Sequence, residues 1–134
     1  MRLLVCGSRK YRDVEHVYMT LDDINRRTPV TCVIHGAAMG ADTLGKEWAI
    51  TNGIKHRPFQ AKWMEIYGPN VVLRHSIRTG RPYNMLAGFE RNQRMIDEGK
   101  PDFYVAFFLS GAKNAGTKDM VERCKKAGIK GIEI

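Results

Sequence analysis

The sequence predicts a three-layer α/β domain, with helices on both faces of a mostly parallel sheet of five strands. Two observations carry this prediction. Short apolar runs alternate along the chain with helical patterns of about ten to fifteen residues, and each alternation fits a right-handed β-α-β crossover. The length of 134 residues also suits one such unit, so we interpret residues 1–134 as a single domain.

Five short runs of β-branched, aliphatic or aromatic residues are typical of strands. Four of them are strongly apolar, and the fifth, at 55–59, is more polar, as an edge strand would be. The predicted strands lie at 3–6, 30–34, 55–59, 103–109 and 129–134.

Between these runs, apolar residues recur at three- and four-residue spacing, which indicates amphipathic helices. Glycines mark the ends of three of them: Gly53 follows the second helix, Gly99 the third and Gly128 the last. The predicted helices cover 14–24, 42–50, 89–96 and 120–127.

Residues 68–86 show neither period. The segment contains Arg74, His75, Arg78 and Arg81 but no acidic residue. A stretch of this length without a pattern in a compact domain is usually functional or mobile. We therefore predict an irregular basic loop, which leaves three roles open: a lid over a ligand, a surface that grips a partner, and a disordered insertion.

Composition narrows the class of protein. The net charge of +8 favours nucleotides, nucleic acids or acidic partners without selecting among them.

The three cysteines, Cys6, Cys32 and Cys124, are odd in number and form no CxxC pair. This indicates reduced thiols in a cytoplasmic protein and argues against a disulfide framework and a zinc site. We expect no metal and no other cofactor. No apolar run reaches the roughly 18 residues of a membrane span, and the N-terminal run reads as a strand rather than a signal peptide.

Three glycine-containing turns follow predicted strands, at 7–10, 35–40 and 110–117. In open parallel sheets, ligands bind beyond the carboxyl ends of the strands, and the N-terminus of a following helix suits a phosphate. Three such turns on one edge therefore indicate an anion-binding pocket. The alternative is three ordinary tight turns, and the small residues of HGAAMGADTLGKEWA, at 35–49, are compatible with both.

One near-match to a known motif does not meet the chemical requirements of that motif. The run from Gly40 to Glu47 almost fits the phosphate-binding pattern GxxxxGK[ST]. Glu47 replaces the hydroxyl that would hold magnesium, and the run lies inside the predicted helix rather than before it. We exclude ATP hydrolysis by this route and expect Asp42 to cap or open the helix.

Five motifs in order, GSRKYRD, HGAAMGADTLGKEWA, AKW, AGFERNQRM and GAKNAGTKDMV, resemble the YspA-like branch of the SLOG superfamily. This is the Rossmann-like group named after the SMF/DprA and LOG proteins. The resemblance covers nearly the whole chain apart from 68–86. It implies a five-stranded Rossmann-like sheet with a site for a nucleotide or nucleotide-derived ligand, in a superfamily that includes sensors of such ligands as well as enzymes.

The resemblance also implies where a ligand binds. The first turn would line one side of the pocket, the second its middle, and Gly116 with Thr117 would cradle a phosphate. Trp63, at the edge of the unpatterned segment, has an aromatic face able to stack on a base. The expected ligand-binding residues are Gly7, Ser8, Arg9, Gly36, Ala37, Gly40, Asp42, Arg91, Asn92, Gly111, Gly116 and Thr117.

LOG enzymes release the base of a nucleoside monophosphate with an Arg from an R-K-x-x-M motif and a Glu from G-G-x-G-T-x-x-E. Arg91 in RNQRM matches the arginine, but Met120 stands at the glutamate position. A thioether neither stabilises an oxocarbenium ion nor acts as a general base, and the adjacent Asp119 lies about 100° around the helix. The catalytic candidates are therefore Arg91 with Asp119 or Glu90 as the acid.

Three functions from different classes follow. The leading hypothesis is a cytoplasmic protein of bacterial or phage type that senses or sequesters a small nucleotide derivative, such as ADP-ribose, NAD or a mononucleotide. The alternatives are N-glycosidic hydrolysis of a nucleotide and nucleic-acid binding through the 68–86 loop. Rossmann-like domains of this size often pair, so a homo-oligomer is a further expectation, whereas a membrane partner is not.

Overall fold

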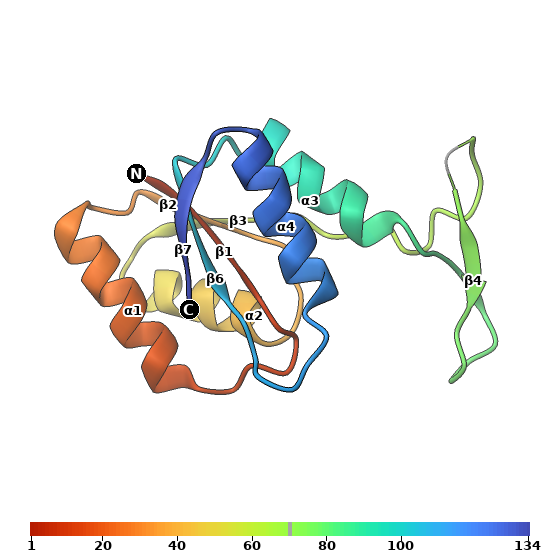
Figure 1. The fold of residues 1–134 in the computed structure, drawn as a ribbon, viewed down its shortest axis with the longest axis horizontal. Coiled ribbons are helices and arrows are strands. Elements are labelled where there is room, and N and C mark those ends of the chain that lie inside the picture. Colours follow the sequence, from red (N-terminus) through yellow and green to blue (C-terminus); the bar gives the residue numbers. More distant parts are fainter. Residues whose placement is uncertain (70) are drawn as a thin grey trace.

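The computed structural model describes residues 1–69 and 71–134, and its centre is a five-stranded sheet in the order β3-β2-β1-β6-β7 (Figure 1). All four strand pairings are parallel, as predicted. The chain builds outward from β1 to one edge and then crosses to the other side of β1, so the strand order reverses between β1 and β6. The strands are β1 (Arg2–Gly7), β2 (Cys32–His35), β3 (Lys55–Pro58), β6 (Phe103–Phe107) and β7 (Lys130–Glu133).

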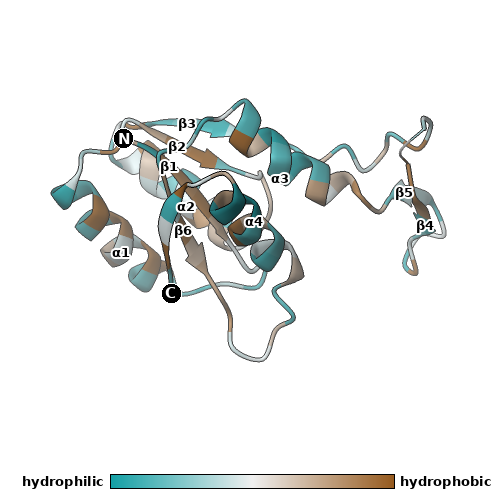
Figure 2. Ribbon diagram, turned by 45° about the horizontal axis from the view of Figure 1, so that its top comes forward, coloured by the Kyte–Doolittle hydropathy of each residue, from teal (hydrophilic) through white to brown (hydrophobic). Residues whose placement is uncertain are grey.

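In the described part of the chain, four helices cover the sheet in two layers, which confirms the three-layer α/β prediction (Figure 1). Helices α1 and α2 pack on one face, and α3 and α4 pack on the other. In Figure 2 the central strands β1, β2 and β6 are largely hydrophobic, whereas the edge strand β3 is hydrophilic. The helices are α1 (Val14–Arg27), α2 (Ala41–Thr51), α3 (Ala87–Asp97) and α4 (Ala115–Lys126).

The central strand β1 is apolar on both faces, because each face is covered by helices. Leu3 and Val5 belong to the core under α1 and α2, and Leu4 and Cys6 belong to the core under α3 and α4. This period of two places successive side chains in opposite cores. The edge strand β3 is largely exposed, which agrees with the polar character of its sequence.

The segment at 68–86 differs from the predicted irregular loop. It contains an antiparallel hairpin of β4 (Leu73–His75) and β5 (Pro82–Asn84), which projects from the body of the domain beyond the start of α3 (Figure 1). Residue 70 of this segment lies outside the described residues. The strands span three residues each and every β4 side chain is exposed, so no apolar alternation marks them in the sequence.

Two further sequence expectations concern membranes and cysteines. Within 1–69 and 71–134, no helix combines the length and the apolar character that crossing a membrane requires. Cys6, Cys32 and Cys124 are all buried and unbridged. In the same ranges, no group of three or more His, Cys, Asp or Glu side chains is arranged to hold a metal ion.

Candidate functional site

A pocket of about 330 Å³ opens beyond the carboxyl ends of β1 and β2, beside the point where the strand order reverses. Its volume falls in the range of small-molecule sites, and its position is the one where open α/β sheets bind ligands. The walls come from the turns after β1 and β2, the segment that leads into α3, the inner side of α3 and the start of α4. The lining residues are Cys6, Gly7, Ser8, Arg9, Gly36, Ala38, Asp42, Trp63, Met85, Gly88, Phe89, Arg91, Asn92, Met95, Asn114, Ala115, Gly116, Thr117 and Met120.

The structure brings together nine of the twelve residues predicted to bind a ligand. The three that do not line the pocket are Ala37, Gly40 and Gly111. Ala37 lies in an adjoining hollow, and Gly111 is exposed in the turn before α4. The nine that line it are Gly7, Ser8, Arg9, Gly36, Asp42, Arg91, Asn92, Gly116 and Thr117.

The two glycines of the turn after β2 have different roles. At Gly40, where φ is +79°, a Cβ would overlap the carbonyl oxygen of Ser8 and lie 2.6 Å from that of Arg9. Gly40 therefore serves the tight packing of two turns. At Gly36, a Cβ would lie 2.6 Å from Nη1 of Arg91 and 2.9 Å from Oδ2 of Asp42. Gly36 therefore makes room for two charged side chains at the pocket.

Asp42 lies in the first turn of α2, so it helps to open the helix, but it does not cap it, because the N-cap position belongs to Gly40. The helix begins after Gly40, and the Oδ2 atom of Asp42 accepts hydrogen bonds from the N–H groups of Gly36, at 3.0 Å, and Ala38, at 3.3 Å. The carboxylate thus holds the turn after β2, and these two amides are not free for an anion. Burial raises the pKa of Asp42 to about 6, and the positive charge of Arg91 opposes that rise. The Oδ1 atom accepts no hydrogen bond from a described residue.

Arg91 reaches the pocket from α3 and is fixed at two points. Its Nη1 atom donates to the carbonyl oxygen of Gly36, and its Nε atom donates to Oδ1 of Asn92 at 3.1 Å. Burial lowers the pKa of the guanidinium, and the carboxylate of Asp42 counteracts that effect. A cation held this rigidly is suited to contact a phosphate or carboxylate of a ligand.

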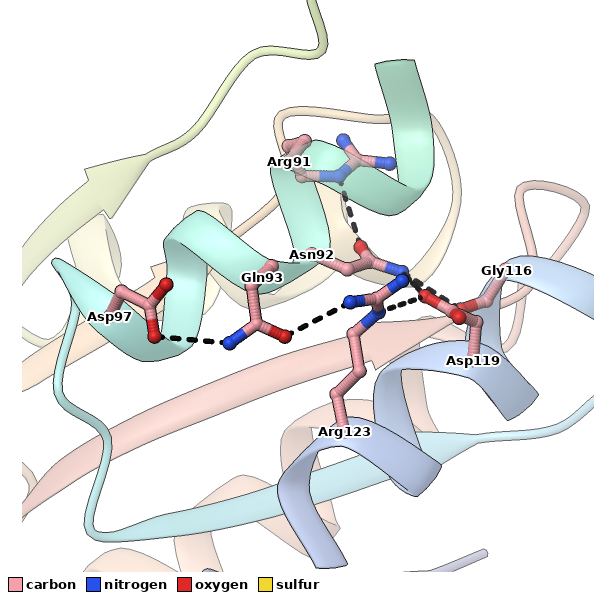
Figure 3. Close-up of polar contacts among 7 residues, drawn as sticks. All are labelled: Arg91, Asn92, Gln93, Asp97, Gly116, Asp119 and Arg123. Carbon is pink, nitrogen blue, oxygen red and sulfur yellow. Dashed lines mark hydrogen bonds and ion pairs between the residues drawn. The ribbon is translucent and has the colours of Figure 1, made fainter. Parts of the chain in front are cut away.

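A polar network joins α3 to the start of α4 (Figure 3). Asn92 donates through Nδ2 to the carbonyl oxygen of Gly116, at 3.2 Å, and to Oδ2 of Asp119, at 3.0 Å. The same Asp119 oxygen forms an ion pair with Nε of Arg123 at 2.8 Å. Asp119 therefore braces the helices and does not line the pocket, and Glu90 is exposed and does not line it either.

The N-terminus of α4 presents unpaired amides to the pocket. The preceding residue, Asn114, has a left-handed φ of +53°, and its side chain hydrogen-bonds the main chain of its own turn instead of capping the helix. The amide of Lys118 is the first to bond within the helix, to Asn114 at 2.9 Å. The N–H groups of Ala115, Gly116 and Thr117 have no acceptor among the described residues. A Cβ on Gly116 would meet nothing within 4 Å, so the space beside these amides is open.

Trp63 stands at the mouth of the pocket. The guanidinium of Arg9 lies 5.6 Å from the centre of its ring, and the ring of Tyr83 approaches it edge to face at 6.2 Å. A Cβ on Gly88 would lie 3.1 Å from the Trp63 ring, so α3 packs closely against it. Trp63 thus links the pocket to the base of the hairpin.

Sequence reasoning did not assign several lining residues to the site. Met85, Gly88 and Phe89 reach the pocket because the chain leaves the hairpin there and enters α3. The only signal for them was their place in or beside the AGFERNQRM motif. Asn114 and Ala115 belong to the third glycine turn, which the sequence marks as a whole without singling out these two residues.

His35, at the end of β2, lies outside the main pocket. Its Nδ1 atom accepts the N–H of Ala37 at 3.1 Å, and its Nε2 atom lies 3.1 Å from Nδ1 of His56. Burial, with smaller contributions from His56 and Lys46, lowers the pKa of His35 to about 4. The imidazole is therefore neutral near pH 7 and supports the turn after β2.

Comparison with known proteins gives a family and a relative. The family model described as YspA, cpYpsA-related SLOG family matches residues 1–65. The Gene 61 protein of Mycobacterium phage D29 is 32% identical over 130 residues, which is 96% of this chain and 91% of the phage protein.

Two solved structures share the fold. DNA processing protein A (DprA) from Streptococcus pneumoniae superposes with a TM-score of 0.55 at 16% identity, over 98% of this chain and 58% of that protein. The UDP-GlcNAc 2-epimerase from Neisseria meningitidis, bound to UDP-GlcNAc, gives a TM-score of 0.51 at 15% identity, over 100% of this chain and 32% of the enzyme. At these identities the likeness shows the fold alone.

Proposed function

This chain belongs to the YspA, cpYpsA-related SLOG family, and from that premise we propose that it binds a nucleotide or nucleotide-derived molecule as a sensor or sequestering protein. The observation that carries the proposal is the meeting of three unpaired helix amides, a fixed arginine and an aromatic ring around one pocket. These are the groups that a phosphate and a base require.

The phosphate would bind at the start of α4. The free N–H groups of Ala115, Gly116 and Thr117 and the partial positive charge of a 12-residue helix favour an anion there. Arg91 lines the same pocket and supplies a full positive charge. The turn after β2 would contribute little to phosphate binding, because Asp42 already accepts two of its amides.

The base would stack against Trp63 at the mouth of the pocket. The ring is half-buried, and Arg9 lies over it, so one aromatic face and one cation border the space a base would enter. The pocket volume of about 330 Å³ is near the lower end for small-molecule sites. That size favours a mononucleotide unit inside the pocket, with the remainder of a longer derivative outside it.

Binding without turnover fits the placement of the acids. Asp119 is engaged by Asn92 and Arg123, and Glu90 is exposed, so neither stands beside a ligand in the pocket. The carboxyl of Asp42 does face the pocket, but its Oδ2 atom is engaged with the turn after β2. We therefore favour a sensor over an N-glycosidic hydrolase.

Calorimetric titration with AMP, GMP, ADP-ribose and NAD tests the proposal, and failure of all four to bind would refute it. Chromatography of the same samples tests hydrolysis, because release of free base that Arg91→Ala abolishes would show an enzyme. We expect no release.

Fluorescence locates the base. The chain has two tryptophans, and Trp48 is fully buried in the core, so ligand-induced quenching should come from Trp63. Trp63→Phe should remove the quenching and keep most of the affinity. Trp63→Ala should weaken binding by about tenfold, as loss of one stacking interaction predicts. Quenching that persists in Trp63→Phe would place the base elsewhere.

A further inference from the structure

A second groove, of about 1030 Å³, adjoins the nucleotide pocket and runs from it to the hairpin. The pocket and the groove share Arg9, Trp63 and Met85, so a ligand in the pocket that continued past Trp63 would enter the groove. The groove is lined by Arg9, Trp63, Met64, Arg74, His75, Ser76, Ile77, Arg78, Thr79, Arg81, Pro82, Tyr83 and Met85.

The charge of this groove is positive and uncompensated. Four arginines line it, and no acidic residue is among its described lining residues. The printed sequence has no Asp or Glu between Glu65 and Glu90. None of the four arginines forms an ion pair with a described residue. A concave surface of one sign attracts a ligand with several charges of the opposite sign.

Aromatic rings alternate with these cations. Tyr83 pairs directly with Arg74 across the hairpin, so both side chains lie on one face of it. The Tyr83 ring meets Trp63 edge to face at 6.2 Å, and Arg9 lies over Trp63 at 5.6 Å. Aromatic faces that stack bases, interleaved with arginines that contact phosphates, are the combination that binds single-stranded nucleic acid.

The hairpin contacts the rest of the domain at its base, where Tyr83 meets Trp63 and the N–H of Asn84 donates to the Trp63 carbonyl, and its outer part is exposed. All three β4 side chains are exposed, and Ile77 at its turn is fully exposed. A two-stranded hairpin is at best marginally stable alone in water, so a ligand along its basic face would stabilise it. An acidic protein surface would match the charge but not the aromatic faces. A single-stranded nucleic acid matches both.

We propose that the pocket takes the terminal nucleotide of a single-stranded nucleic acid, whose following nucleotides run along the groove to the hairpin. This inference rests on the proposed function, since it assigns a mononucleotide unit to the same pocket. It adds a polymeric ligand, with the phosphates after the first contacting Arg74, Arg78 and Arg81.

The test compares a mononucleotide with an oligonucleotide. TMP is titrated by calorimetry, and 3′-labelled oligothymidylate and oligouridylate of about twelve nucleotides by fluorescence anisotropy, which separates DNA from RNA as the source of the strand. We expect either oligonucleotide to bind at least about tenfold more tightly than the mononucleotide at low salt. Four phosphate contacts predict that raising salt from about 50 to about 200 mM weakens oligonucleotide binding about 50-fold.

A triple variant isolates the groove. With Arg74→Ala, Arg78→Ala and Arg81→Ala combined, the same rise in salt should weaken binding only about threefold, because one arginine contact remains. The triple variant should also lose the advantage of the oligonucleotide over TMP while TMP still binds.

A control variant removes three charges elsewhere. Lys55→Ala, Lys126→Ala and Lys130→Ala combined lower the net charge equally, at exposed sites that line none of the pockets described. This variant should keep the wild-type affinity and salt dependence. An equal loss of oligonucleotide affinity in both triple variants would show that net charge alone explains the effect, and it would overturn the inference.

The remaining outcomes separate the two proposals. If TMP binds and neither oligonucleotide binds more tightly, the groove proposal is overturned and the nucleotide pocket stands. If a covalently closed circle of oligothymidylate binds as well as the linear strand of equal length, a terminal nucleotide is not what the site takes. If no nucleotide of any kind binds, the proposed function fails and this inference with it.

Discussion

Replacing Asp42 with asparagine is expected to remove a pH dependence of stability that the buried carboxyl imposes on the wild type. Asp42 is 6% exposed, and burial raises the pKa of its carboxyl from the usual 3.8 to about 6. An amide of the same shape still offers an oxygen to the N–H groups of Gly36 and Ala38. Asparagine therefore keeps much of the local structure and removes the titrating group together with its negative charge beside Arg91.

The size and sign follow from linkage. Because the folded protein holds the Asp42 proton more tightly than the unfolded chain does, the contribution of Asp42 to the free energy of unfolding is greatest at low pH and falls as pH rises between about 4 and 6. A shift of about two units corresponds to about 3 kcal/mol over the whole window. As pH falls from about 8 to 5, the free energy of unfolding of the wild type should rise by about 1.4 kcal/mol relative to that of Asp42→Asn.

Urea denaturation of both proteins at a series of pH values measures this difference. Subtracting the variant from the wild type at each pH removes the contributions of other titrating groups. The difference in the free energy of unfolding should move in favour of the wild type as pH falls from 8 to 5. A gap that stays constant, or that moves in favour of Asp42→Asn, would show that the carboxyl is not held at the raised pKa.

The remaining predictions concern Gly40 in the turn after β2, with Gly53 after α2 as its control, and His35 at the end of β2. Gly40→Ala should lower the free energy of unfolding by about 3 kcal/mol or more, because the new Cβ would overlap the Ser8 carbonyl. Gly53→Ala, at a φ of +65° with nothing within 4 Å, should cost only about 1 kcal/mol of left-handed strain. Equal losses in thermal melts would contradict the close approach at Gly40. The pKa of His35 is lowered to about 4, so the unfolded chain binds this proton more tightly than the folded protein does. The free energy of unfolding of the wild type should therefore fall by about 3 kcal/mol as pH falls from 6.5 to 4. His35→Gln should lack this loss, and an acid-induced loss of equal size in the variant would refute the assignment.

The sheet and its four helices were predictable from the sequence because burial leaves a periodic pattern. Leu3, Leu4 and Val5 are completely buried, and successive residues pack into opposite cores, so β1 reads as a continuous apolar run. The hairpin leaves no such pattern. Its strand at Leu73–His75 is exposed throughout, and its pairing depends on the turn rather than on an apolar face.

The location of the site was predictable for the same reason as the sheet. Parallel strands end at one edge, so the turns that contain Ser8, Gly36 and Gly116 had to lie near one another. The role of Asp42 was not predictable, because it depends on the path by which the turn after β2 folds back over the carboxylate. The position of Gly88 at the pocket likewise depends on the packing of α3 against α4.

Heteronuclear NMR of the backbone amides during titration with AMP tests the central claim most directly. If the start of α4 binds the phosphate, the amides of Ala115, Gly116 and Thr117 should show the largest shifts, and those of Gly36 and Ala38, already bonded to Asp42, should shift less. Saturating AMP that leaves the three α4 amides unmoved, or that moves the turn after β2 instead, would contradict the account.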